Sequence, residues 1–440
     1  MQTVDLIINA RWLVPVTTLQ PVLENHAVVI KDSRIVTLLP QDDAKQQYTA
    51  HTVHDLNQHC LIPGLINNHT HTAMSLFRGL ADDLPLMSWL NDHIWPAEKQ
   101  FVSDSFVEAG SALAIAEMIR SGTTCFSDMY FFPEATARVV DRSGIRASLG
   151  MVVIEFPSNW AANVDEYLHK GQQLHDHYRH HPLISTSYAP HAPYTVADKT
   201  LESIIVNAEE MDLPIHMHIH ETAGEVSQSI EEFGMRPLQR LKQIGLLSPR
   251  LIAAHMTQLN AEEMDWCTEA GVHIAHCPES NLKLASGFCP VAELDKRGVN
   301  ITIGTDGAAS NNDLDMFAEM RQTALLAKAV GQDPSAIPAH TALAMATINA
   351  AKSLGIDQHT GSIEAGKAAD LVAIDMSSLE TQPCFDVVSQ LVYAASRDKV
   401  SDVWVAGKQL LKNRQLTTLD EQKIIADTQQ WAAKIGPFHT

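Results

Sequence analysis

The chain has 440 residues, of which 45% are hydrophobic and 19% charged; this is the composition of a globular protein and excludes a disordered or fibrous chain. Its 52 acidic and 31 basic side chains give a net charge of −21, which repels phosphate backbones and anionic lipid surfaces at long range. We therefore expect neither a nucleic acid nor a membrane as a partner.

The first sixty residues contain short strand-like runs separated by turn-forming Pro, Asp, Ser and Asn: DLIINARWLVPV, AVVIKDSRIVTLLP and TVHDLN. They predict a strand meander with one half-exposed face and no helix. The amino terminus lacks the basic segment and apolar stretch of a signal peptide, and no apolar run is long enough to span a bilayer. The six cysteines form no CxxC pair, which is typical of reduced thiols. These features favour a cytoplasmic location.

From Leu61 onward, short β-rich runs alternate with amphipathic helical patterns, which is the pattern of parallel βα units. Residues 105–120 illustrate a helix of this kind, for which Ser105 and Glu108 predict a capping box and Gly122 a stop. Eight strands are expected, at LIPGLINNH, TTCFSDM, IRASLGMVV, LISTSYAPH, LPIHMHIH, LIAAHM, VHIAHC and NITIGTD. Eight strand and helix units predict a distorted (β/α)8 TIM barrel over residues 61–361.

After Gly361 the sequence returns to short strands and turns, in GSIEAGKAADLVAIDM and VSDVWVAGKQLLKN. No low-complexity linker separates this part from the rest of the chain. We therefore expect residues 1–60 and 362–440 to form a small β-sandwich domain that packs against the barrel.

The active site of a barrel lies at the carboxyl ends of its strands, and four predicted strands end in groups that can bind a metal. These groups are His69 and His71; His216, His218 and His220 with Glu221; His255; and Asp306. Side chains two residues apart in a strand point the same way, so the histidines of each strand are expected to share one face. A single His-x-His pair is more often a hydrogen-bonded pair in a core or on a surface than a metal site. For the whole set, the alternative to a metal site is a group of buried histidines that are hydrogen-bonded to backbone carbonyls.

Three imidazoles and one carboxylate suit a divalent ion such as zinc or iron, whereas calcium and magnesium require more oxygen ligands. The expected site holds one ion and keeps an open position. Such an ion lowers the pKa of a bound water toward neutrality, and a nearby histidine and aspartate can take its proton.

Six motifs in order, PGLINNHTH, HIHE, AAH, HCPESNLKLASG, IGTDGAASNN and GSIEAGKAADL, resemble the amidohydrolase superfamily, in particular the 5′-methylthioadenosine/S-adenosylhomocysteine deaminases. The resemblance covers nearly the whole chain. It implies one divalent metal ion per subunit, Zn²⁺ with Fe²⁺ or Mn²⁺ as alternatives, held by His69, His71, His218 and Asp306. It further implies that His255 activates water with Asp306, that Glu221 moves protons at the purine, that Glu98 binds the ribose hydroxyls, and that His191 contacts the substrate.

The reaction implied is hydrolytic deamination of the adenine of 5′-methylthioadenosine, S-adenosylhomocysteine or adenosine to hypoxanthine, with release of ammonia. Relatives that bind the amino-acid tail of S-adenosylhomocysteine use arginines beyond strand three. Here Arg146 is followed by FPSNWAANVDEYLHKG, which has none, so we expect methylthioadenosine to be preferred. An apolar wall for its thioether is expected from Phe156, Trp160, Met87 or Trp89, for which core packing is the alternative.

Three other functions fit parts of the pattern. A guanine or s-triazine deaminase or chlorohydrolase has the same metal site, but Glu98 and His191 favour a riboside. A binuclear hydrolase of the dihydroorotase type needs a lysine on strand four, and ISTSYAPHAP has none. A third alternative is a non-enzymatic scaffold that has kept the barrel and lost the site. Such a protein would not need the expected metal ligands, and all of them are present here. For the assembly we expect a homodimer or a higher homo-oligomer.

Overall fold

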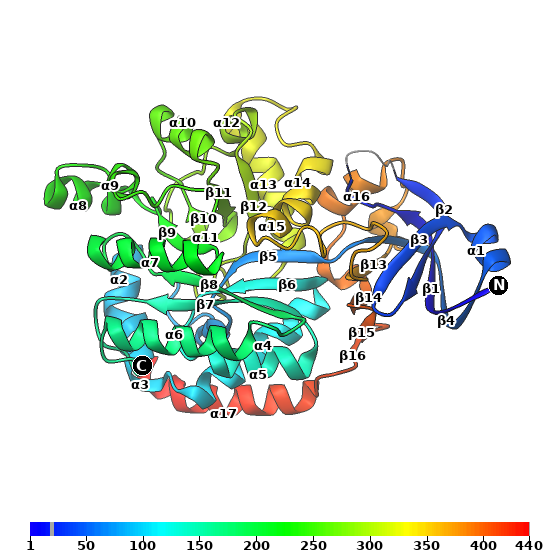
Figure 1. Ribbon diagram of the computed structural model, residues 1–440, viewed down its shortest axis with the longest axis horizontal. Helices are drawn as coiled ribbons and strands as arrows, with labels where there is room; N and C mark the ends of the chain where they lie inside the picture. Colours follow the sequence, from blue (N-terminus) through cyan, green and yellow to red (C-terminus); the bar gives the residue numbers. More distant parts are fainter. Residues whose placement is uncertain (18–21, 440) are drawn as a thin grey trace.

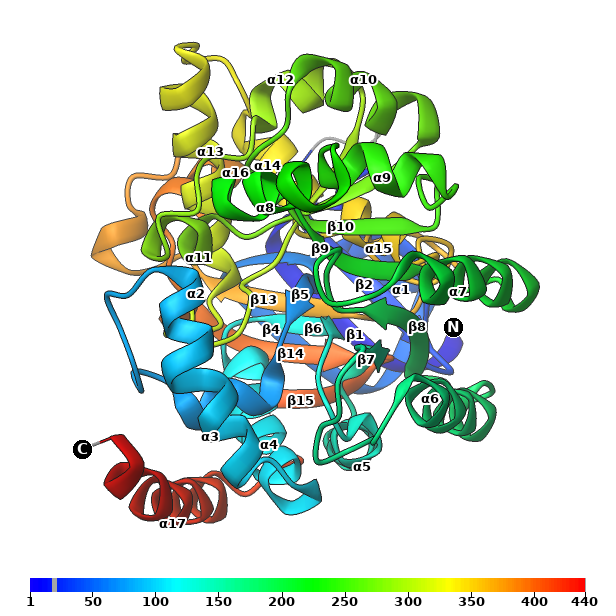
Figure 2. The ribbon, with the colours of Figure 1, turned by 90° about the vertical axis from the view of Figure 1, so that its left-hand side faces the viewer.

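The computed structural model describes residues 1–17 and 22–439. Eight parallel strands pair in the order β12-β11-β10-β9-β8-β7-β6-β5, and helices surround them (Figure 2). All eight strands lie where the sequence predicts them. Their bounds are β5 Leu65–Thr70, β6 Thr123–Asp128, β7 Arg146–Val153, β8 Ile184–Pro190, β9 Ile215–Ile219, β10 Leu251–His255, β11 His273–His276 and β12 Asn300–Ile303.

Side-chain amides close the barrel between its first and last strands. Asn67 Nδ2 donates to Thr305 Oγ1 at 2.8 Å, and Asn68 Nδ2 donates to Thr302 Oγ1 at 2.7 Å. The chain after β12 comes close to β5 at Gly304, where an added Cβ would lie 2.7 Å from the backbone nitrogen of His69. Only glycine fits this approach, which brings the end of β12 beside the end of β5.

The helices between and around the strands include the ring that covers the barrel. They are α4 Asp104–Arg120, α5 Pro133–Ser143, α6 Val164–Tyr178, α7 Asp198–Met211, α8 Ala223–Phe233, α9 Pro237–Gln243, α10 Ala261–Ala270, α11 Pro278–Lys283, α12 Val291–Lys296, α13 Met316–Gly331, α14 Ala339–Met345 and α15 Ile348–Ser353. The start of α4 corrects one prediction. Its N-cap is Ser103, whose hydroxyl accepts from the Phe106 backbone nitrogen, so the predicted capping box of Ser105 and Glu108 is wrong.

A second sheet, formed from both ends of the chain, lies at one side of the barrel, as the sequence predicts (Figure 1). Its strands pair in the order β16-β15-β14-β13-β4-β1-β2-β3. Their bounds are β1 Gln2–Leu13, β2 Leu23–Lys31, β3 Arg34–Pro40, β4 Tyr48–Pro63, β13 Leu371–Asp375, β14 Val400–Val405, β15 Lys408–Lys412 and β16 Gln415–Leu416. The amino-terminal part is not the simple meander predicted: helix α1 (Gln41–Gln47) returns the chain, so β4 pairs in parallel with β1.

Three elements outside the two sheets matter for the site. An insertion between β5 and α4 contains a 3₁₀ turn η1 (Thr72–Phe77), α2 (Leu86–Ser88), a π-helix η2 (Trp89–Ile94) and α3 (Trp95–Phe101). The helix α17 (Glu421–His439) packs along α4 and also contacts α3 and η1 (Figures 1 and 2). The remaining short helices are η3 Leu379–Thr381, α16 Val387–Tyr393 and η4 Arg397–Lys399. Within the described ranges, no helix combines the length and apolar character needed to cross a bilayer.

Candidate metal centre and active site

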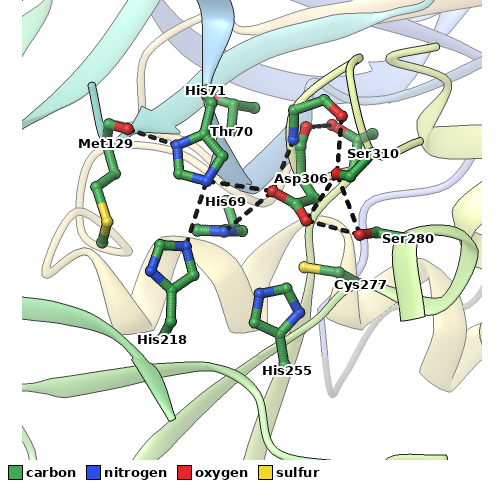
Figure 3. Close-up of polar contacts among 12 residues, drawn as sticks. His69, Thr70, His71, Met129, His218, His255, Cys277, Ser280, Asp306 and Ser310 are labelled. Atoms are coloured by element: carbon green, nitrogen blue, oxygen red, sulfur yellow. Dashed lines mark hydrogen bonds and ion pairs between the residues drawn. The ribbon is translucent and has the colours of Figure 1, made fainter. Parts of the chain in front are cut away.

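Four imidazoles and a carboxylate meet at the carboxyl ends of the barrel strands (Figure 3). His69 ends β5 with His71 just after it, His218 lies in β9, and His255 ends β10. Asp306 follows β12. Two overlapping groups, His69 with His218 and His255, and His69 with His71 and Asp306, each have ligand atoms within 4.8 Å of one another. The structure therefore brings together every metal ligand that the resemblance implies.

Two residues of this site have a strained backbone. His255 has φ 74° and Asp306 has φ 64°, which is the left-handed region that residues with a Cβ rarely adopt. The Asp306 backbone nitrogen donates to the His69 carbonyl at 2.9 Å, which holds the strained turn against β5. Such strain persists only where the surrounding fold fixes it, and here it directs both side chains toward the other histidines.

Each of the expected ligand histidines has its Nδ1 engaged on the side away from the cluster. His71 Nδ1 bonds the Met129 carbonyl, and His218 Nδ1 bonds the His191 carbonyl at 2.7 Å. His69 Nδ1 lies 3.0 Å from His216 Nε2. These partners fix the rings with Nε2 toward the cluster, which is how proteins orient histidine ligands.

The donor set passes a direct test for a metal site. His69 Nε2 is buried and has no hydrogen-bond partner, although it points at the cluster, and an unsatisfied buried nitrogen is costly unless a ligand fills the position. Burial lowers the pKa of His69 to about 4, so its ring is neutral, as a metal ligand must be.

Asp306 is held as a carboxylate. Burial acts to raise its pKa, but the adjacent His69 and His71 hold that pKa well below the usual range. Its Oδ2 accepts from the hydroxyls of Ser280 at 2.7 Å and Ser310 at 3.0 Å, while Oδ1 faces the histidines. Oδ1 also accepts from the Gly307 backbone nitrogen at 2.7 Å, so the protein orients both oxygens and leaves Oδ1 facing the histidines.

His255 and Glu221 lie side by side next to the cluster. The Nε2 of His255 is 4.0 Å from Glu221 Oε2, and its Nδ1 bonds Asn281 Oδ1 at 2.9 Å. Burial raises the pKa of Glu221, which favours a carboxyl group that can donate as well as accept a proton. The Glu225 carboxylate accepts from the backbone nitrogen of Glu221 at 2.7 Å and so fixes the turn that carries it.

A cavity opens from the cluster, and it contains the two residues expected to contact substrate. Glu98, on α3, accepts a hydrogen bond from the Tyr130 hydroxyl at 2.7 Å, and burial raises the pKa of Glu98 to about 7. His191, at the end of β8, has a pKa lowered to about 3 by burial, so it is neutral. The cavity is lined by His71, Met74, Leu86, Trp89, Leu90, Ile94, Trp95, Glu98, Met129, Tyr130, Phe131, Val152, Ile154, Phe156, His191, Tyr194, His218, Glu221, His255, Leu284, Asp306 and Ser310.

The lining shows which of the four residues expected to form an apolar wall face the cavity. Phe156 and Trp89 line the cavity, and Phe156 packs edge-on against Trp95 at 6.0 Å. Trp160 is instead buried with its indole nitrogen donating to Glu134, and Met87 does not line the cavity. Among the described residues, no lysine or arginine lines this cavity.

Two of the remaining candidates lie elsewhere. His220 does not share the face of His218, because β9 ends at Ile219 and His220 has φ 54°; its Nε2 accepts from the Leu238 backbone nitrogen. Arg146 is at the opposite end of the barrel, where it pairs with Asp370 at 3.0 Å. The expected single face of three histidines is therefore wrong for His220.

Sequence reasoning missed three residues that hold the site: Tyr130, Glu225 and Asn281. Tyr130 follows the strand TTCFSDM, at the end where barrel loops carry function, so its position was an available signal. Glu225 occupies an ordinary helical position, and no sequence signal distinguishes it. Asn281 lies inside the quoted motif HCPESNLKLASG, which marks the segment without marking the residue.

Comparisons with known proteins agree with this geometry. The model of the amidohydrolase family matches residues 60–410. The 5-methylthioadenosine/S-adenosylhomocysteine deaminase of Teredinibacter turnerae is 51% identical over 434 residues, which cover 99% of this chain and 98% of the relative. A crystal structure of an adenosine deaminase from Xanthomonas campestris with bound zinc has a TM-score of 0.98 and 50% identity, and each chain is covered to 99%. A zinc complex of a mutant atrazine chlorohydrolase from Arthrobacter aurescens has a TM-score of 0.89 at 23% identity, covers 97% of this chain and 99% of that chain, and shares the fold.

Proposed function

The chain belongs to the amidohydrolase family, and from this premise we propose that it deaminates the adenine ring of 5′-methylthioadenosine to hypoxanthine and releases ammonia. It is a hydrolase that acts on C–N bonds. One observation carries the choice of substrate: the cavity that opens from the His and Asp cluster also contains Glu98, a carboxylate suited to two ribose hydroxyls. A bare ring such as guanine has no vicinal hydroxyls to donate to this carboxylate.

The proposed cofactor is one zinc ion per subunit, held by His69, His71, His218 and Asp306. The unsatisfied Nε2 of His69, the neutral rings of His69 and His218, and the orientation of all three rings support this assignment, as does the zinc in the Xanthomonas campestris structure. A divalent ion bound there makes water a nucleophile near neutral pH. Iron and manganese accept the same donor set.

The chain's own groups then move the protons. Water adds to C6 of the purine, and His255 Nε2 together with Asp306 accepts the proton that the water loses; Nε2 is available because Nδ1 is engaged by Asn281. Glu221 donates to ring N1 as electron density moves there, since its raised pKa favours the protonated form. The proton taken up by His255 and Asp306 then passes to the amine, the C6–N bond breaks and ammonia leaves. The C6 hydroxyl gives its remaining proton to Glu221, so C6 becomes a carbonyl and Glu221 is protonated again.

The substrate tail distinguishes the proposed substrate from its closest competitor. The zwitterionic tail of S-adenosylhomocysteine needs a cation for its carboxylate, whereas the methylthio group of methylthioadenosine is neutral and apolar. Phe156, Trp89 and Trp95 supply apolar and aromatic surface, and no lysine or arginine of the described residues lines the cavity. We therefore propose that methylthioadenosine is preferred over S-adenosylhomocysteine.

The test is ammonia release by the zinc-loaded protein with methylthioadenosine, S-adenosylhomocysteine, adenosine, guanine and a triazine compared side by side. The highest kcat/KM is expected with methylthioadenosine. Equal values for the two thioethers would remove the tail argument, and turnover of guanine or the triazine alone would refute the role of Glu98.

We also propose that the protein works in the cytoplasm as a homodimer, without nucleic acid or membrane partners. The six cysteines are free thiols, which suits a reducing compartment, and the net charge of −21 opposes anionic surfaces. Leu379 and Phe385 are 91% and 93% exposed, and a second copy would cover apolar surface of this kind. Sedimentation analysis of the purified protein tests the dimer.

A further inference from the structure

A second apolar cluster, separate from the barrel core, lies behind one wall of the cavity. Its buried members include Met74, Trp89, Leu90 and Ile94, and each of these four also lines the cavity. One side of these residues faces the substrate position and the other side packs into the cluster. The shape of this wall therefore depends on what fills the cluster from behind.

The helix α17 fills the cluster from behind. Ile435 is 4% exposed and is a buried member of the cluster, and Trp431 packs against it. The Trp431 ring lies edge-on to Phe106 at 5.2 Å, and Phe106 in turn packs on Phe77 at 4.9 Å. Figures 1 and 2 show α17 beside α3 and α4. In the sequence, α17 is far from the barrel strands that carry the proposed metal ligands.

The wall segment, residues 86–101, has polar contacts mainly at its carboxyl end, where Asn159 Nδ2 donates to the Lys99 carbonyl at 3.0 Å and the Tyr130 hydroxyl donates to Glu98, and its amino-terminal part is held by packing. Its elements α2, η2 and α3 follow one another without a break, so they form one helix; the amino end at Pro85 has no side-chain cap, and the middle turn is π-helical. Helix ends without such caps, and π-helical turns, are weakly held and depend on packing. The start of α17 is by contrast fixed to α4, since Arg120 pairs with Glu421 at 3.0 Å.

We propose that α17 is a positioning element of the active site, in which Trp431 and Ile435 hold the wall segment, and with it Glu98, against the substrate. This inference rests on the proposed function for its kinetic consequence. The metal ligands stand on barrel strands with their own core, so loosening the wall weakens substrate binding and leaves the chemical step in place.

The test uses the full-length, zinc-loaded variants Trp431→Ala and Ile435→Ala. The matched control is Ile425→Ala on the same helix, where the side chain is 48% exposed. The first measurement is hydrogen exchange of the backbone amides of residues 86–101, compared with residues 133–143 of α5. We expect exchange in the wall segment to rise about tenfold in both variants, with α5 and the control unchanged.

The second measurement is the kinetics with methylthioadenosine. KM is expected to rise about fivefold in both variants while kcat stays within about twofold and zinc content is unchanged. A role in stability alone would lower the melting temperature without changing exchange in residues 86–101 or KM, and this result would overturn the proposal. Ile435→Val replaces Ile435→Ala if the larger truncation does not fold.

The two readouts separate this proposal from the proposed function. Exchange reports on the wall segment without any substrate. Unchanged exchange in both variants refutes the role of α17 whatever the enzyme acts on. Increased exchange in a protein that does not deaminate methylthioadenosine supports the positioning role and refutes the substrate.

Discussion

Replacing Tyr130 by Phe removes one hydroxyl from a buried aromatic ring and leaves Glu98 without its hydrogen-bond donor. The bond is 2.7 Å long, and Tyr130 is 5% exposed, so the ring itself stays packed. A hydrogen bond to a charged acceptor contributes about 1.5–3 kcal/mol, and water in the cavity replaces part of it. We therefore expect KM for methylthioadenosine to rise about tenfold, which corresponds to about 1.4 kcal/mol, with kcat changed less than about twofold.

The same change moves the pH dependence in a defined direction. Burial raises the pKa of Glu98 to about 7, and the Tyr130 hydrogen bond acts against that rise. Only the ionised carboxylate accepts from both ribose hydroxyls, so kcat/KM falls as the pH decreases through the pKa of Glu98. Without the hydroxyl this pKa increases further, and the acidic limb moves to higher pH.

The assay is a set of pH profiles of kcat/KM for methylthioadenosine and, as a substrate without ribose, adenine. The control Tyr188→Phe also removes a hydroxyl from a buried tyrosine, 3% exposed, on a strand position that does not line the cavity. An unchanged KM in Tyr130→Phe, or an equal loss with adenine, would refute the reasoning that Tyr130 acts through Glu98 on ribose.

The other predictions concern Glu98 itself, the proton carriers and the metal. Glu98→Ala should weaken the binding of ribosides and abolish the acidic limb, and an unchanged apparent affinity would remove its ribose role. Glu221→Gln should keep zinc, measured by metal analysis, but lose about 10²- to 10⁴-fold in kcat, because the amide cannot protonate N1. Asp306→Asn should lose both turnover and zinc affinity; normal turnover would contradict its place among the ligands. Chelation should lower the melting temperature, and added zinc should restore it, since ligand binding stabilises the folded state; a melting temperature insensitive to both would argue against the proposed metal site.

The barrel strands could be predicted because their signal is local. Each is a short run rich in β-branched and apolar residues, bounded by turn residues and followed by a helical pattern, and each appears at its predicted place. The places of the candidate site residues could be predicted for a similar reason. Once the strands are placed, a polar residue at a carboxyl end must lie at the barrel mouth, as His69, His255 and Asp306 do.

Features that depend on contacts between distant segments could not be predicted. Tyr130 meets Glu98 only because the insertion after β5 folds back over the end of β6. The parallel pairing of β4 with β1 is another case, since local patterns do not report strand order. Trp431 and Ile435 lie in a helix whose periodicity predicts an apolar face without saying what that face covers.

The histidines of strand β9 show where sequence periodicity stops being informative. Alternation places His216 and His218 on one face, yet the two rings have different partners. His218 has its Nδ1 bonded to a carbonyl and its Nε2 at the cluster, whereas His216 Nε2 contacts His69 Nδ1 and its own Nδ1 bonds Ser127. The deeper ring, His216, therefore orients His69, and the ring nearer the mouth, His218, is the one with a nitrogen at the cluster.

His220 leaves that face altogether because alternation holds only while the strand continues. β9 ends at Ile219, and the positive φ of His220 turns its ring toward the backbone of α9. In this His-x-His-x-His run, depth along the strand separates the three imidazoles: His216 contacts His69 from the deeper side, His218 has its Nε2 at the cluster, and His220 has already left the sheet. The middle histidine, His218, is therefore the one that we propose as a metal ligand.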